Sequence, residues 1–105
     1  MGHYEILIYD KANGDMEAIY DYIAETFHAP ITAAKQYDRI AEAILSLEEM
    51  PERIKIMDSA PEHSQELRSL IVDNYSVFFV IKAKTVCIVR VLYSASDINK
   101  RLSEE

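Results

Sequence analysis

The feature that most constrains the fold is a pair of apolar runs, residues 75–82 and 85–93, with only two residues between them. Both runs are rich in β-branched and aromatic residues, which favour strands. A two-residue connection permits only an antiparallel pairing. Asp73-Asn74 forms a similar short turn after the run at residues 66–72. The C-terminal half therefore predicts a three-stranded antiparallel meander with strands at Glu66–Val72, Tyr75–Lys82 and Thr85–Tyr93.

The N-terminal end of the chain predicts one further strand and then a turn. Tyr4–Tyr9 is short and rich in strand-forming residues. Lys11–Asp15 is expected to be a turn or loop, because Asn13-Gly14 breaks regular structure. Asp15 is then placed to cap a helix that begins at Met16.

Two apolar stripes at helical spacing follow this turn. Thr26–Ala29 separates them, Pro30 suits the first turn of the second helix, and Pro51 requires that helix to end before it. Two helices joined by so short a break predict an antiparallel hairpin. The stripes are Met16, Ile19, Tyr20, Ile23 and Phe27 in the first helix and Ala33, Tyr37, Ile40, Ala41, Ile44 and Leu47 in the second.

The order of these elements predicts an α+β, two-layer fold: an N-terminal strand, a helical hairpin that covers one face of the sheet, and the meander. Residues 51–64 are expected to form a loop, and Ser96–Glu105 a short terminal helix or a frayed end. A chain of 105 residues predicts a single domain, residues 1–105.

Composition restricts the function classes. The net charge is −7, from 18 carboxylates against 11 Lys and Arg, which disfavours a phosphate-gripping surface. Cys87 is the sole cysteine and the three histidines are scattered, so neither a metal site nor a cofactor is expected. The chain has no apolar run near the ~20 residues of a membrane span. We therefore expect a cytoplasmic protein without a membrane partner.

Three residues of the meander, Arg68, Arg90 and Tyr93, are candidates for a site. Neighbouring antiparallel strands can bring them to one end or face of the sheet, with Arg90 on the same face as Val86, Ile88 and Leu92. Two interpretations remain open. In the first, arginine clamps a phosphate or carboxylate while tyrosine stacks on a base or donates a proton. In the second, Arg90 pairs with an acid such as Asp97 or Glu66, and Tyr93 packs.

The ordered set of motifs resembles the RelE/ParE superfamily of toxins from type II toxin–antitoxin systems, a group that includes plasmid stabilisation proteins. LRSLIVDNYSVFFVIKAKTVCIVRVLYSASD is similar to the C-terminal half of that family, and DMEAIYDYIAETF with AAKQYDRIAEAILSLEEMPER is similar to its helical hairpin. The resemblance spans about Tyr4 to Leu102. It implies a β-α-α-β-β-β fold, a bacterial growth inhibitor and a small antitoxin that silences it.

The family has two branches, and the departures of this chain bear on the choice between them. RelE-like members cleave messenger RNA on the ribosome, whereas ParE-like members poison DNA gyrase. The basic run after the fourth strand is replaced by Ser94-Ala95-Ser96-Asp97, and Ser76 stands where RelE-like nucleases carry arginine. The family positions Arg68, Arg90 and Tyr93 remain. RNA cleavage needs cations around its charged transition state, so a ParE-like gyrase inhibitor is favoured over an enzyme.

Two alternatives remain open: a RelE-like mRNA interferase with Arg68, Arg90 and Tyr93 as its active set, and a degenerate module that only binds the antitoxin. The expected partners are the antitoxin, gyrase or the ribosome, in a homo-oligomer or a toxin–antitoxin hetero-oligomer. An amphipathic helix of a partner is expected to contact the hairpin through the stripe residues Tyr20, Phe27 and Tyr37, if these stay partly exposed.

Overall fold

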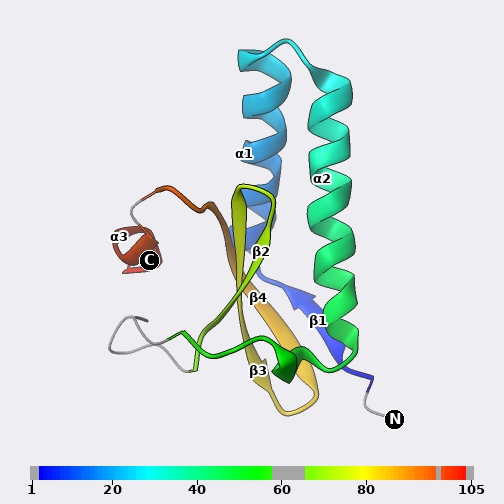
Figure 1. Ribbon diagram of the computed structural model, residues 1–105, viewed down its shortest axis with the longest axis vertical. Helices are drawn as coiled ribbons and strands as arrows, with labels where there is room; N and C mark the ends of the chain where they lie inside the picture. Colours follow the sequence, from blue (N-terminus) through cyan, green and yellow to red (C-terminus); the bar gives the residue numbers. More distant parts are fainter. Residues whose placement is uncertain (1–2, 58–65, 97, 104–105) are drawn as a thin grey trace.

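The computed structural model describes residues 3–57, 66–96 and 98–103, and its element order confirms the expected α+β fold (Figure 1). A short strand is followed by two long helices, two 3-10 turns, three further strands and a short final helix. The elements are β1 (Glu5–Ile8), α1 (Asp10–Thr26), α2 (Pro30–Leu45), η1 (Ser46–Glu48), η2 (Pro51–Arg53), β2 (Arg68–Val72), β3 (Tyr75–Lys82), β4 (Thr85–Tyr93) and α3 (Ile98–Ser103).

The four strands form one sheet in the order β1-β4-β3-β2. β2, β3 and β4 pair antiparallel, as the short turns predict. β1 instead pairs parallel with β4, so that Ile6 lies beside Val86 and Ile8 beside Ile88. The last strand of the sequence is therefore an interior strand of the sheet.

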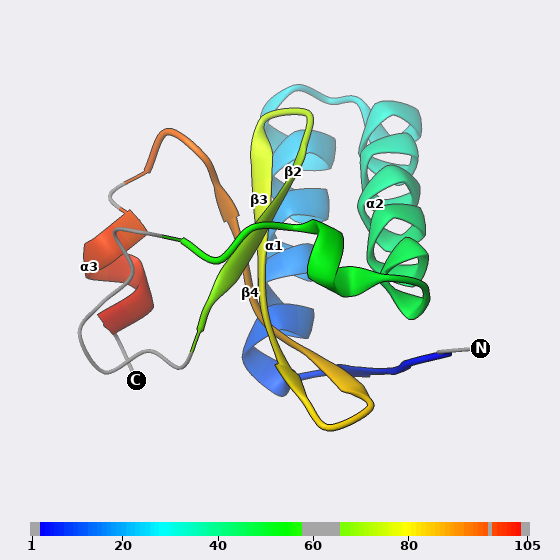
Figure 2. The same cartoon turned by 60° about the horizontal axis from the view of Figure 1, so that its bottom comes forward.

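The helical hairpin of α1 and α2 packs on one face of the sheet and encloses the larger core (Figure 2). Ile40, Ile44 and Leu47 are buried there, and Ala33 is buried as well, as their spacing predicts. The strands contribute a matching apolar set on that face: Val72, Val77, Phe79, Val86, Ile88 and Val91. Burial of these side chains supplies most of the driving force for folding.

A smaller apolar cluster lies on the other face of the sheet. Its buried members are Leu67, Phe78, Val80, Cys87 and Leu92, and Ile98 and Leu102 of α3 pack against it. The C-terminal tail is thus a short helix that covers part of this second face (Figure 1).

The expected loop at Lys11–Asp15 is wrong, because α1 begins at Asp10 and runs through Asn13-Gly14. Tertiary packing overrides the local break: Ala12 and Met16, one helical turn apart, are both buried against the sheet. Gly14 costs helix stability but lies on the exposed side. Asp15 is consequently inside the helix and not a cap.

Other boundaries shift by a few residues. The first strand is shorter than Tyr4–Tyr9, and β2 begins at Arg68 because Glu66 has a left-handed φ of 47°. Helix α2 ends at Leu45, well before Pro51, and the chain continues through the two 3-10 turns. The expected loop at 51–64 contains η2, and its residues 58–64 lie outside the described part. No helix in the described ranges has the length and hydropathy to span a membrane.

Candidate functional site

Arg68 is the first residue of β2, and its guanidinium binds backbone carbonyl groups. It donates hydrogen bonds to the carbonyl oxygens of Ile54, at 2.6 Å, and Glu52, at 3.3 Å. Ile56 also forms an isolated β-bridge with Arg68. These bonds tie the segment after η2 to the edge of the sheet, which is a structural role.

Arg90 on β4 is buried, and its guanidinium forms a two-point ion pair with Asp15 of α1. The Nε–Oδ2 distance is 2.7 Å and the Nη2–Oδ1 distance is 2.9 Å. The third nitrogen donates to the backbone carbonyl of Arg101, at 3.1 Å. The structure thus contains an ion pair between Arg90 and an acidic residue. Of the two acids named from the sequence, Glu66 is exposed just before β2, and Asp97 lies outside the described residues.

A register shift in β4 changes which face each of its residues occupies. Ile88 is aligned with Phe79 and Arg90 with Phe78, so Val89 is an extra residue in a β-bulge. The expectation that Arg90 shares a face with Val86, Ile88 and Leu92 is therefore wrong for Val86 and Ile88 and holds only for Leu92. The first two belong to the core under the helices, and Leu92 belongs to the cluster under α3.

The same shift separates the two candidate arginines. Arg68 is aligned with Phe79, whose side chain faces the helical hairpin, whereas Arg90 is aligned with Phe78, whose side chain faces α3. Aligned residues on neighbouring strands point to the same face of a sheet. Arg68 and Arg90 therefore point to opposite faces, and the structure does not bring them together in one site.

Tyr93, at the end of β4, lies in a groove of about 530 Å³ between α1, the ends of β3 and β4, and α3. Its ring meets the ring of Tyr75 edge to face, with 5.9 Å between centroids. Buried side chains of α1 and β4 form the floor. The lining residues are Asp15, Ala18, Ile19, Tyr22, Ile23, Phe27, Asn74, Tyr75, Val91, Leu92, Tyr93 and Arg101.

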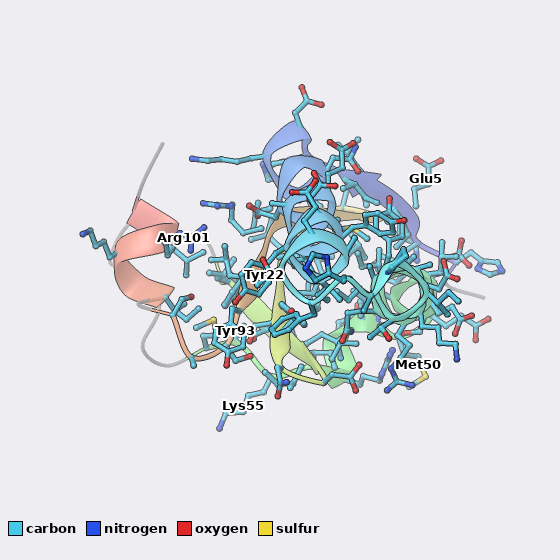
Figure 3. All side chains as sticks on the ribbon, turned by 90° about the horizontal axis from the view of Figure 1, so that it is seen from above. Glu5, Tyr22, Met50, Lys55, Tyr93 and Arg101 are labelled. Carbon is cyan, nitrogen blue, oxygen red and sulfur yellow. The ribbon has the colours of Figure 1, made fainter. Side chains whose placement is uncertain are left out.

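The groove combines exposed aromatic rings with one cation. Tyr22, Phe27 and Tyr93 are 58%, 62% and 51% exposed, and the rings of Tyr22 and Phe27 also meet edge to face. Figure 3 shows Tyr22, Tyr93 and Arg101 on the same side of the molecule. Burial, with Tyr93 and Tyr22 nearby, raises the pKa of Tyr75, so its hydroxyl stays protonated at neutral pH. Such a surface suits a partner with apolar side chains.

Comparison with known families matches the chain to the ParE toxin of the type II toxin–antitoxin system parDE, over residues 6–98. The chain belongs to this family. It is thus a toxin of the RelE/ParE superfamily, as the motifs in its sequence indicate. No curated protein matches it significantly.

Solved structures share the ParE fold at low sequence identity. The chromosomal ParDE system of P. aeruginosa aligns with a TM-score of 0.73 and 23% identity, covering 89% of this chain and 98% of the other. The RelBE2 complex of Mycobacterium tuberculosis gives 0.57 and 19%, with 87% and 98% covered. The archaeal RelE–RelB complex of Pyrococcus horikoshii OT3 gives 0.59 and 15%, with 91% and 99% covered.

In this ParE-family toxin, the positions that the resemblance gives to nuclease cations are neutral. Ser76 is buried and its hydroxyl hydrogen-bonds the hydroxyl of Ser94, at 2.7 Å. The hydroxyl of Ser96 donates to the carbonyl of Tyr93, closing the turn after β4. Within the described residues, no cluster of three or more His, Cys, Asp or Glu side chains is arranged to hold a metal ion.

The sequence did not indicate the partners of Tyr93 and Arg90. Tyr22 lies outside the apolar stripe of α1, and an aromatic residue on a polar helix face is the signal that marks it. Phe27 is exposed, and Tyr20 and Tyr37 are half-buried, so all three stay at least partly exposed as expected; Tyr20 and Tyr37 pack edge to face with 6.5 Å between centroids. For Asp15 and Arg101, no sequence signal predicts their contacts with Arg90.

Proposed function

We propose that this ParE-family toxin acts by binding and not by RNA cleavage, that DNA gyrase is its target, and that a cognate antitoxin silences it. The observation that supports this most is the state of Arg90. Its guanidinium is occupied by Asp15 and by the carbonyl of Arg101, and Arg90 is not among the residues that line the groove around Tyr93.

Cleavage of RNA without a metal requires a group that activates the 2′-hydroxyl and cations that stabilise the charged transition state. Loss of one such group costs roughly 10²–10³ in rate. The guanidinium groups of Arg68 and Arg90 are held by separate structural partners: backbone carbonyls after and within η2 for Arg68, and Asp15 for Arg90. A net charge of −7 also opposes approach to ribosomal RNA. These features favour the gyrase-directed function over an mRNA interferase.

The antitoxin partner is supported by the family and by the fold neighbours, which were solved as ParDE, RelBE and RelE–RelB assemblies. The groove around Tyr93 supplies an apolar surface for a partner. Exposed rings of this kind gain free energy when a partner removes them from water. The toxin and antitoxin would then form a hetero-oligomer.

The proposal is tested with purified toxin in a gyrase supercoiling assay, with the product of the adjacent reading frame as the antitoxin. We expect loss of supercoiling and accumulation of cleaved DNA, both reversed by the antitoxin. Tyr93→Ala should weaken inhibition at least tenfold. Met50→Ala is the matched control, because Met50 is exposed far from the groove (Figure 3) and its variant should inhibit like the wild type.

A parallel primer-extension experiment on ribosome-bound message should show no cuts. Unchanged supercoiling with excess toxin, or codon-dependent cuts that Tyr93→Phe abolishes, would contradict the gyrase proposal. Expression in a bacterium without the antitoxin should arrest growth. Harmless expression would instead indicate a degenerate, antitoxin-binding module.

A further inference from the structure

The end of β4 projects beyond the strand beside it. β1 ends at Ile8, which is aligned with Ile88, and the amide of Tyr9 makes the next bond to the carbonyl of Ile88, at 3.0 Å. Farther along, the Val91 amide on β4 donates to a side chain, the carboxylate of Asp15, at 2.9 Å. Asp15 thus satisfies a strand amide at the point where β1 no longer runs beside β4.

The same carboxylate holds the guanidinium of Arg90. The two side chains are 9% and 11% exposed, so the pair lies in a largely dry environment. Arg90 in turn donates to the carbonyl of Arg101 in α3. A continuous chain of hydrogen bonds therefore runs from α1 through β4 to α3. We call Asp15, Arg90 and the Val91 amide the clasp.

Helix α3 needs such support. It has six residues, and isolated helices of that length are not stable in water. Among its anchors are the bond from Arg90 and the apolar side chains of Ile98 and Leu102. Cys87 belongs to the cluster against which these two side chains pack, and it is almost fully buried. Movement of α3 away from the sheet would uncover that cluster.

Two residues that line the groove, Tyr93 and Arg101, are held in place by the clasp. Tyr93 follows the strand segment that Asp15 holds through the Val91 amide, and Arg101 belongs to the helix that Arg90 holds. We propose that Asp15 is a positioning residue: through Arg90 and Val91 it keeps α3 docked and fixes Arg101 and Tyr93 in the lining of the groove. This inference rests on the proposed function only where it concerns partner binding.

The thiol of Cys87 offers a direct readout, because the chain has no other cysteine. The rate at which an aromatic disulfide reagent labels Cys87 in native buffer reports how often the cluster opens. Leu102→Ala, which loosens α3 without touching the clasp, should raise this rate and so establish that the label detects movement of α3. Asp15→Asn should raise the labelling rate at least tenfold, since the amide lacks the negative charge and has only one oxygen, so it cannot accept from both the Nε and the Nη2 of Arg90.

Local opening is separated from global unfolding by the effect of urea. Opening of α3 exposes little surface, so the labelling rate should rise only weakly with urea, whereas global unfolding depends on it strongly. Arg90→Lys serves as a second variant: it keeps the charge but lacks the planar fork that reaches both Asp15 and Arg101. It should also label at least tenfold faster. Unchanged labelling in both variants, or acceleration that follows global unfolding in its urea dependence, would overturn the proposal.

The functional step is tested separately in the supercoiling assay. Asp15→Asn and Arg90→Lys should require at least tenfold more toxin for the same inhibition, while Met50→Ala behaves as the wild type. If wild-type toxin leaves gyrase untouched, the proposed target is wrong and the labelling rates still decide the clasp. If the variants label faster but inhibit normally, the clasp does not position the groove, and that half of the inference fails.

Discussion

Asp15 and Arg90 are 75 residues apart in the sequence, and their side chains meet at 2.7 Å. The pair joins the second turn of α1 to the interior strand β4 at a place that water barely reaches. A second ion pair, Arg39 with Asp73, has the same two-point geometry between α2 and the turn after β2, but its side chains are 63% and 34% exposed. The chain thus contains two matched pairs that differ mainly in burial.

Truncation of the two arginines should have unequal effects. Arg90→Ala leaves the Asp15 carboxylate buried without its cation, and we expect the free energy of unfolding to fall by about 3–5 kcal/mol. Arg39→Ala releases Asp73 into water, and its effect should be much smaller. Urea denaturation of both variants beside the wild type measures the difference. Equal destabilisation by the two changes would contradict the burial assigned to Arg90.

Gly14→Ala should stabilise the protein. Gly14 lies inside α1 on its exposed side, and a methyl group there would meet no atom within 4 Å. Alanine in place of glycine in a helix interior gains about 0.5–1 kcal/mol, largely because the unfolded chain loses freedom. The midpoint of thermal unfolding should therefore rise. A fall would indicate that residues 11–15 do not form a helix in solution.

The carboxyl group of Asp73 should titrate below its ordinary value of 3.8, because hydrogen bonds from Arg39 and, to a lesser degree, Gln36 lower its pKa. A lowered pKa stabilises the fold above the ordinary value, and this contribution disappears as the pH falls through the folded-state pKa. Arg39→Leu should raise the pKa of Asp73 towards 3.8 and reduce this loss in acid. NMR titration of the Asp73 side-chain carboxyl, in the wild type and in Arg39→Leu, measures the change in its pKa.

The control for that titration is Gln36→Ala, which should raise the pKa of Asp73 less than Arg39→Leu does. High salt should also raise the pKa of Asp73 in the wild type, because the ion pair is exposed and therefore screened. A pKa that does not respond to Arg39→Leu would mean that the ion pair does not form in solution.

Two isoleucines of α2 test the orientation of that helix. Ile40 is fully buried against the sheet, and Ile40→Ala should cost about 2–5 kcal/mol of unfolding free energy. Ile31 is 73% exposed near the start of the same helix, and Ile31→Ala should change stability by less than about 0.5 kcal/mol. Chemical denaturation of the two variants beside the wild type checks both values. A large loss from Ile31→Ala would place that side chain in an interface.

The elements that the sequence predicts well are those with a local periodic signal. The stripe of α2 and the strands β3 and β4 follow from spacing and short turns, because each turn leaves a single possible pairing. The left-handed residues Asp73 and Ala83 occupy these turns. Lys11–Asp15 was interpreted wrongly because Asn13-Gly14 is a strong local breaker, whereas burial of Ala12 and Met16 is a tertiary effect.

The site was less predictable because its relationships are not local. Nothing in the spacing of residues places Asp15 beside Arg90, or β1 parallel to β4. The bulge at Val89 reverses the alternation of side chains in the second half of β4, and with it the face that Arg90 occupies. Tyr93 was identified as a candidate from its position at the end of a strand, and its neighbours in the groove come from α1 and α3.

The parallel pairing of β1 with β4 has a consequence for synthesis of the protein. β1 pairs with residues 85–88 of β4, so it has no strand partner in the sheet until those residues have been synthesised. The nascent chain can form its helices early, but it cannot assemble the groove that α1 shares with β4 and α3. A translation product truncated before β4 and α3 therefore lacks the complete groove.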